Sequence, residues 1–155
     1  KMKILICFGT RPEYIKVKSL IENIKGVKTC FTGQHKDLLK NMKVDYELGM
    51  RDEFSEERLN NIYCNIMKND YIFNNVEYVI VQGDTTSACA IAISAYQRGK
   101  KIIHLEAGLR SGEKRDPFPE EMNRQLIGRI GDIHLCPTEW NRRNLWKESL
   151  FIWWQ

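Results

Sequence analysis

The sequence predicts an α/β protein built on a doubly wound parallel sheet, because short apolar runs alternate with amphipathic stretches along the chain. Each apolar run ends at a glycine or a polar motif, which is typical of buried strands. The stretches between them carry apolar residues at helical spacing and begin with capping residues. No repeat, low-complexity segment or linker interrupts the pattern, so we expect a single domain over residues 1–155 with one hydrophobic core.

The first strand is expected over residues 3–8, an apolar run that leads into a polar motif. Thr10 and Glu13 then have the spacing of a capping box, which predicts the start of a helix. The apolar stripe of this helix ends at Gly26, a residue suited to a helix C-terminus. A second strand follows over residues 27–32.

The next part of the chain continues the alternation less regularly. We expect a short helix over residues 36–42 and a third strand over 44–48. Ser55 is suited to cap a long helix whose apolar face includes Ile62 and Ile66. The spacing of these two isoleucines, four residues apart, places them on one side of that helix.

The clearest central strand is expected over residues 78–81, and Gly83 stops it. The helix after it, over residues 85–98, is rich in small residues and should pack closely on the sheet. Its opening residues Thr85, Thr86 and Ser87 would offer hydroxyls and backbone N–H groups to an anion.

Residues 101–105 form the next expected strand. Residues 106–118 contain two glycines and a proline among many charges, which indicates a functional loop. Pro119 then opens a helix that ends near Ile130. A last strand is expected over residues 133–136, before a final helix capped by Thr138.

Composition narrows the range of functions. The chain is 43% hydrophobic and 28% charged, as is usual for a globular protein, and its net charge of +4 is mixed in sign along the sequence. This charge does not indicate a nucleic-acid partner. No apolar run approaches the roughly 20 residues of a membrane span, and the N-terminal run is too short for a signal peptide, so we expect no membrane partner.

The cysteines and histidines give no sign of a metal site or a cofactor. The cysteine count is odd and there is no CxxC, so we expect buried free thiols in a reducing cytoplasm. No His, Cys and Asp spacing suggests a metal ion, and no GxGxxG follows the first strand, which argues against a nicotinamide or flavin cofactor. The cysteines are Cys7, Cys30, Cys64, Cys89 and Cys136.

Three carboxylates follow expected strands or open an expected helix. Since the carboxyl ends of parallel strands meet at one edge of a sheet, Asp84, Glu106 and Glu120 should converge on one cleft. Each also has a purely structural explanation. Asp84 could cap the helix that follows it, Glu106 could pair with Arg110 or Arg115, and Glu120 suits the positive end of its helix.

Several polar groups are candidates to bind the ligand. Arg11 and Lys16 flank the start of the first helix, where an arginine fork and a lysine charge can hold a pyrophosphate. Arg124 lies one turn after Glu120, so it could pair with that carboxylate or reach a substrate. His35 follows a strand and should lie at the edge of the crevice.

The two other histidines have a simpler interpretation. His104 and His134 fall within strands, so we expect core residues with satisfied ring nitrogens.

Five motifs, in this order, resemble those of the nonhydrolysing UDP-N-acetylglucosamine 2-epimerases, and the likeness runs from about residue 3 to 144. The resemblance implies the N-terminal half of a glycosyltransferase-B-like fold, in which two Rossmann-like halves enclose the active site. It also implies interconversion of UDP-GlcNAc and UDP-ManNAc through elimination and re-addition of UDP, in a cytoplasmic homodimer that serves cell-surface polysaccharide biosynthesis. The motifs are Phe8-Gly-Thr-Arg-Pro-Glu13, Gln34-His35, Gly83-Asp-Thr-Thr86, His104-Leu-Glu-Ala-Gly-Leu-Arg110 and Pro117-Phe-Pro-Glu-Glu121.

The resemblance also implies roles for single residues. Asp84, Glu106 and Glu120 match the family's catalytic carboxylates, without an indication of which one removes the proton. Arg11 and Lys16 match its substrate-binding cations, and Arg124 matches a functionally important arginine. Gln34 matches a residue at which a second UDP-GlcNAc activates some bacterial members, but Asp37 stands where that site has another glutamine.

Two departures from the family leave alternatives open. Family chains are more than twice as long, and their second domain supplies a catalytic histidine and most contacts to uridine and pyrophosphate. The chain thus resembles an N-terminal half with little or no activity alone, which could act with a separate C-terminal half. Residues 146–155 form an atypical apolar tail that could pack back, join an interface or mark a truncated frame. A 2-epimerase of another UDP-sugar, such as a diacetamido uronic acid, and a non-catalytic partner-binding half are the alternative functions.

Overall fold

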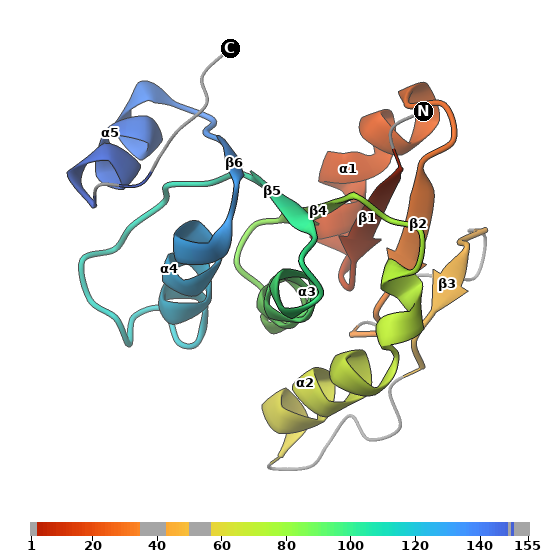
Figure 1. The fold of residues 1–155 in the computed structure, drawn as a ribbon. Helices are drawn as coiled ribbons and strands as arrows, with labels where there is room; N and C mark the ends of the chain where they lie inside the picture. The colour runs from red at the N-terminus through yellow and green to blue at the C-terminus, as the bar shows by residue number, and fades with distance from the viewer. Residues whose placement is uncertain (1–2, 35–42, 50–56, 149, 151–155) are drawn as a thin grey trace.

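The computed structural model describes residues 3–34, 43–49, 57–148 and 150. The strands within these residues form one parallel sheet in the order β3-β2-β1-β4-β5-β6, which is the order of a Rossmann-like doubly wound sheet (Figure 1). The predicted fold class is therefore confirmed. The strands are β1 (Ile4–Phe8), β2 (Lys28–Phe31), β3 (Tyr46–Glu47), β4 (Tyr78–Gln82), β5 (Lys101–Leu105) and β6 (Ile133–Leu135).

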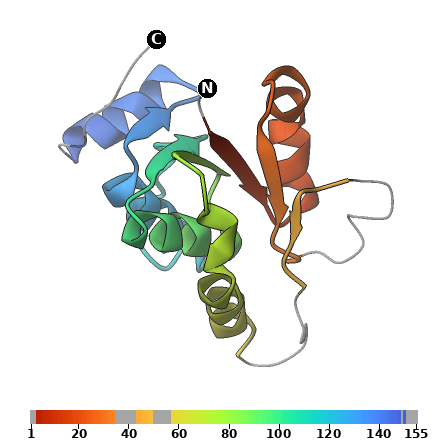
Figure 2. The same cartoon turned by 45° about the vertical axis from the view of Figure 1, so that its right-hand side comes forward.

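Helices cover both faces of this sheet (Figures 1 and 2). One apolar cluster lies between the sheet and α1, and a larger one lies between the sheet and α2, α3 and α4. Since α3 is rich in alanine and buried along nearly its whole length, it packs closely on the sheet as expected. The helices are α1 (Arg11–Asn23), α2 (Arg58–Lys68), α3 (Thr86–Gln97), α4 (Glu120–Ile130) and α5 (Glu139–Lys147), with a short 3-10 helix η2 (Asp70–Phe73).

Three helices in the described part of the chain begin with a side-chain cap formed by a threonine. Thr10 and Glu13 form the expected capping box at the start of α1, and Thr138 caps α5. The cap of α3 is Thr85, whose side chain accepts a hydrogen bond from the N–H of Ala88. The alternative that Asp84 merely caps this helix is therefore wrong, and its carboxylate is available for other contacts.

The expectation of five buried thiols needs one correction. Cys7, Cys30 and Cys89 are buried and Cys136 is partly buried, but Cys64 is exposed. Ile62 and Ile66 form the buried face of α2. Cys64 is two positions from each of them, so it lies on the opposite side of the helix. All five cysteines are free.

Some sequence expectations fall outside the described residues. They are the helix over residues 36–42, the cap at Ser55, and the end of the apolar tail, residues 151–155. None of the helices in the described part of the chain is long and apolar enough to cross a membrane.

The strand order places a ligand crevice between β1 and β4. The chain runs from β1 outward to β2 and β3 and then returns to β4, on the other side of β1. Helices that follow the two central strands therefore lie on opposite faces of the sheet, and the loops after these strands separate. Such a switch point, at the carboxyl ends of the strands, is where open α/β sheets bind ligands.

Candidate active site

A cleft of about 450 Å³ opens at this switch point. Asp84, Glu106 and Glu120 all line it, so the three carboxylates converge as expected, and Lys16 and Gln34 line it with them. With Glu13, the cleft thus combines four acids with a cation at the carboxyl edge of the sheet. The other lining residues are Thr10, Pro12, Glu13, Gln82, Gly83, Thr85 and Leu109.

Glu106 is held by two donors that come from different elements. Lys16 Nζ on α1 lies 2.5 Å from Glu106 Oε2, and the side-chain amide of Gln82, at the end of β4, donates to the same oxygen. The alternative that Glu106 pairs with Arg110 or Arg115 is therefore wrong. Arg110 instead forms a two-point ion pair with Glu148, at 2.7 and 2.9 Å.

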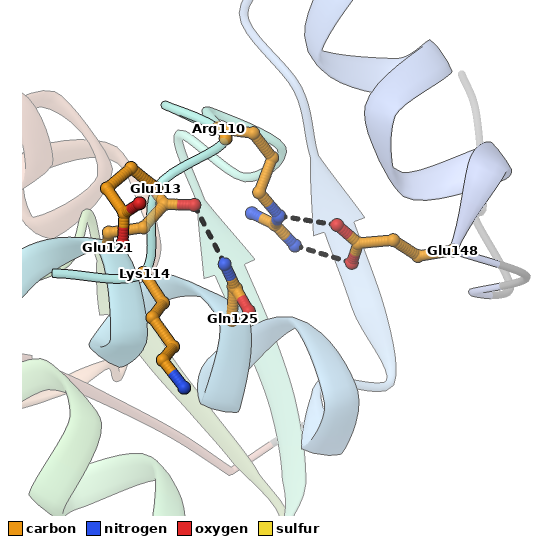
Figure 3. Close-up of a pocket in the computed structure, with 7 residues that line it drawn as sticks. Arg110, Glu113, Lys114, Glu121, Gln125 and Glu148 are labelled. Carbon is orange, nitrogen blue, oxygen red and sulfur yellow. Dashed lines mark hydrogen bonds and ion pairs between the residues drawn. The ribbon is translucent and has the colours of Figure 1, made fainter. Parts of the chain in front are cut away.

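Arg110 and Glu148 border a second pocket, of about 430 Å³, shown in Figure 3. Charged side chains surround it, and Gln125 Nε2 donates to Glu121 Oε1 at 2.8 Å. None of the predicted site residues lines this pocket. The predicted chemistry therefore gathers in the first cleft.

Asp84 is paired with a buried arginine. Arg124 Nη2 is 2.7 Å from Asp84 Oδ2, and Arg124 Nη1 is 3.2 Å from Glu121 Oε2. Burial raises the pKa of Asp84, the Arg124 cation works against this rise, and the nearby charges of Glu120 and Glu106 add to it. A carboxylate with a raised pKa is a stronger base, which suits it to accept a proton in acid–base chemistry.

Arg124 does not pair with Glu120, contrary to one of the sequence expectations. Its side chain is only 7% exposed and is held between Asp84 and Glu121, so it does not line the cleft itself. Glu120 is the first residue of α4 and is partly exposed toward the cleft. Its negative charge is favoured there by the helix dipole.

Glu13 and Glu121 are two buried carboxylates that sequence reasoning did not assign to the site. Glu13 accepts hydrogen bonds from the N–H groups of Gly9 and Thr10 and from the Thr85 hydroxyl, and burial raises its pKa. The capping box predicts the local contacts of Glu13 at the start of α1. It does not predict the contact with Thr85, which lies 72 residues from Glu13 in the sequence.

The hydroxyls at the start of α3 are already engaged. Thr85 donates to Glu13, and Ser87 donates to Gln34 Oε1 at 2.6 Å. Thr86 accepts a hydrogen bond from Asn123. These groups therefore tie the loops of the cleft together.

The two remaining ligand candidates are Arg11, which does not line the cleft, and His35. Arg11 is exposed at the first residue of α1, between two residues that do line it. His35 lies outside the described residues. Within the described part of the chain, no group of three or more His, Cys, Asp or Glu side chains is placed to hold a metal ion.

His104 and His134 are buried, as expected, and their rings meet edge to face with centroids 6.1 Å apart. His104 Nε2 lies 2.8 Å from the carbonyl oxygen of Gly83, but the Nδ1 atoms of both rings have no hydrogen-bond partner among the described residues. The expectation of satisfied ring nitrogens is therefore only half right. Burial lowers the pKa of His104 to about 4.

A family model described as UDP-N-acetylglucosamine 2-epimerase matches residues 21–151. The chain belongs to this family. A UDP-N-acetylglucosamine 2-epimerase from Campylobacter jejuni is 40% identical over 95% of this chain and 42% of its own length.

Solved structures of this family share the fold. A UDP-GlcNAc 2-epimerase from Neisseria meningitidis, bound to UDP-GlcNAc, matches with a TM-score of 0.86 and 34% identity over 97% of this chain and 44% of the other. An enzyme from Methanocaldococcus jannaschii, in complex with UDP-GlcNAc and UDP, matches with a TM-score of 0.81 and 30% identity over 98% and 46%. The chain spans less than half the length of these UDP-N-acetylglucosamine 2-epimerases, as expected for one half of a glycosyltransferase-B-like fold.

Proposed function

We propose that the chain is the N-terminal catalytic domain of a nonhydrolysing UDP-N-acetylglucosamine 2-epimerase, which interconverts UDP-GlcNAc and UDP-ManNAc. The observation that carries this proposal is the convergence of Asp84, Glu106 and Glu120 with Lys16 on one cleft. Family membership supports the substrate class, because relatives of this chain bind UDP-GlcNAc and UDP.

The reaction explains why the cleft needs several acids and a cation. A base removes the C2 proton, and the electrons of the C2–H bond form a C1=C2 double bond as the C1–O bond breaks and UDP leaves with its electron pair. UDP then adds back at C1 while C2 receives a proton on the opposite face. Carboxylates near one another supply and accept these protons, and the cation holds UDP between the two steps.

Individual residues have distinct parts in this proposal. Asp84, Glu106 and Glu120 form the acid–base set that faces the sugar. Lys16 and Arg11 attract the diphosphate, and Gln34 lines the cleft together with Lys16. Arg124 acts on Asp84, whose carboxylate it contacts at 2.7 Å.

The chain alone is expected to bind UDP weakly and to turn over little or no substrate. This expectation rests on length, because the relatives carry more than half of their residues beyond the matched part. A complementary C-terminal half would supply the other side of the cleft.

Proton NMR in D2O tests the proposal. UDP-GlcNAc is incubated with the chain alone and with the C-terminal half of a related epimerase, and deuterium at C2 is followed. We expect exchange only with both halves present, and its loss in Glu106→Gln. Glu22→Gln, which changes an exposed carboxylate on α1, is the matched control and should keep the exchange. No exchange despite demonstrated association would contradict the proposal and favour another UDP-sugar or a non-catalytic half.

The proposal also covers the oligomeric state of the enzyme, its compartment and the use of its product. We expect a homodimer in the cytoplasm that provides UDP-ManNAc for cell-surface polysaccharides. The free thiols of the chain support a reducing compartment. Sedimentation of the active assembly tests the dimer.

A further inference from the structure

Gln82 lines the cleft, and the sheet fixes its position. It is the last residue of β4, only 3% exposed, and it pairs in parallel register with Leu105, the residue before Glu106. The N–H of Gly83 also donates to the carbonyl of Leu105 at 3.0 Å. The pairing of β4 with β5 therefore places the Gln82 side chain next to the Glu106 carboxylate.

The donors around Glu106 all act on one of its oxygens. Lys16 Nζ and the Gln82 amide both contact Oε2. No hydrogen bond to Oε1 is formed within the described residues. This arrangement leaves Oε1 as the oxygen that can exchange a proton with a ligand in the cleft.

The two donors differ in how easily they can leave. Lys16 is 50% exposed at its side chain, carries a full charge on a flexible stem, and comes from a separate element, α1. An incoming diphosphate would attract this ammonium. Gln82 is neutral, buried and fixed by the sheet, so it stays where it is when an anion binds.

Glu106 needs such support because of its backbone. Its φ angle is +61°, in the left-handed region that non-glycine residues adopt only when their surroundings impose it. Side-chain contacts to the strand beside it help to impose this conformation.

We propose that Gln82 is a positioning residue for Glu106: its amide holds Oε2, and so aims Oε1 into the cleft, when substrate draws Lys16 away. The inference rests on the proposed function in so far as Glu106 is one of the reacting carboxylates. The hydrogen bond itself can be tested without any activity.

The first test is NMR on this chain. An amide proton that donates to a carboxylate is shifted downfield and exchanges slowly with water, so the side-chain 1H–15N resonances of Gln82 report the contact. We expect Glu106→Gln to move the bonded Gln82 proton upfield and to speed its exchange, and Lys16→Met to leave it shifted. The Gln125 amide, which donates to Glu121, is the internal reference and should not move. A Gln82 resonance that Glu106→Gln leaves unchanged would overturn the inference.

The second test is C2 exchange by the chain with its complementing half. Gln82→Met keeps the length of the side chain and removes the donor, so we expect kcat to fall about 10- to 100-fold with KM nearly unchanged. Gln82→Glu also removes the donor and should lose kcat similarly. Asn23→Leu removes an exposed side-chain amide bond on α1, to the carbonyl oxygen of Ser19, and should keep full activity.

The outcomes separate this inference from the proposed function. An unchanged kcat in Gln82→Met, or a change in KM alone, would show that Gln82 does not position Glu106 for reaction. If the unaltered assembly shows no exchange at all, the proposed function fails. The Gln82 amide resonance then still decides whether this residue holds Glu106.

Discussion

Two carboxylates of the cleft, Glu106 and Asp84, are held by ion pairs of different kinds. Glu106 is paired with Lys16, and the two side chains are 38% and 50% exposed. Asp84 is paired with Arg124, and these side chains are 27% and 7% exposed. Arg124 is in turn fixed by Glu121, which is fully buried, whereas Lys16 forms no second ion pair within the described residues.

The difference teaches that burial, more than distance, decides what an ion pair does. An exposed pair contributes little to stability because water solvates the separated charges almost as well. Removing one partner of a buried pair leaves a charge without solvent or counter-ion. The Asp84–Arg124 pair is therefore part of the framework, and the Lys16–Glu106 pair can separate when a ligand arrives.

The largest expected effect comes from Arg124→Leu. This change leaves Asp84 and the buried Glu121 without their shared cation, so we expect a loss of about 3–5 kcal/mol in the free energy of unfolding. Removing the cation should also raise the pKa of Asp84 further, because Arg124 lowers it. Urea unfolding measures the first effect and carbon NMR of the carboxyl group the second. A loss below about 1 kcal/mol would remove the distinction between the two ion pairs.

The next effect concerns the turn at the end of β4. His104 bonds the carbonyl of Gly83, which lies between Gln82 and Asp84. Its pKa is about 4 when folded against 6.5 for the free side chain, so the unfolded chain binds more protons between these values. Stability from the neutral ring is complete above pH 6.5 and is lost as the pH falls to 4, by about 3 kcal/mol.

His104→Gln isolates this term, because glutamine cannot titrate and can still donate to Gly83. The difference in unfolding free energy between the variant and the unaltered chain should change with pH across this window and be flat above it. A difference that stays constant from pH 7 to pH 4 would show that His104 is not held neutral.

The smallest effect is expected for Lys16→Met. Because both partners are substantially exposed, the free energy of unfolding should fall by less than about 1 kcal/mol. The same urea measurement as for Arg124→Leu gives a direct comparison. A loss as large as that of Arg124→Leu would mean that the Lys16–Glu106 pair is also part of the framework.

Sequence reasoning succeeded where the signal is local. The capping box of Thr10 and Glu13 acts over three residues, and Thr138 caps its helix over a similar distance. Glycine after an apolar run located the ends of central strands. These signals were enough to place Asp84 and Glu106 at the carboxyl edge of the sheet, and hence to predict their convergence.

Sequence reasoning did not predict which side chains contact each other when the contact depends on the spatial order of strands and helices. Lys16 and Glu106 are 90 residues apart, and Gln82 reaches Glu106 only because β4 and β5 are neighbours in register. Whether Arg124 forms an ion pair with Glu120 or with Glu121 depends on which side of α4 faces Asp84. The roles of these residues in catalysis stay predictions.

The segment after β5 is fastened to α5 at several points. Asn144 Nδ2 donates to the carbonyl of Gly108 at 3.0 Å, a Cβ at Gly108 would collide with the backbone of Asn141, and Arg110 is paired with Glu148. Opening any one of these contacts exposes the others to water. We therefore expect this segment and α5 to unfold locally as one cooperative unit, with matching rates of amide hydrogen exchange.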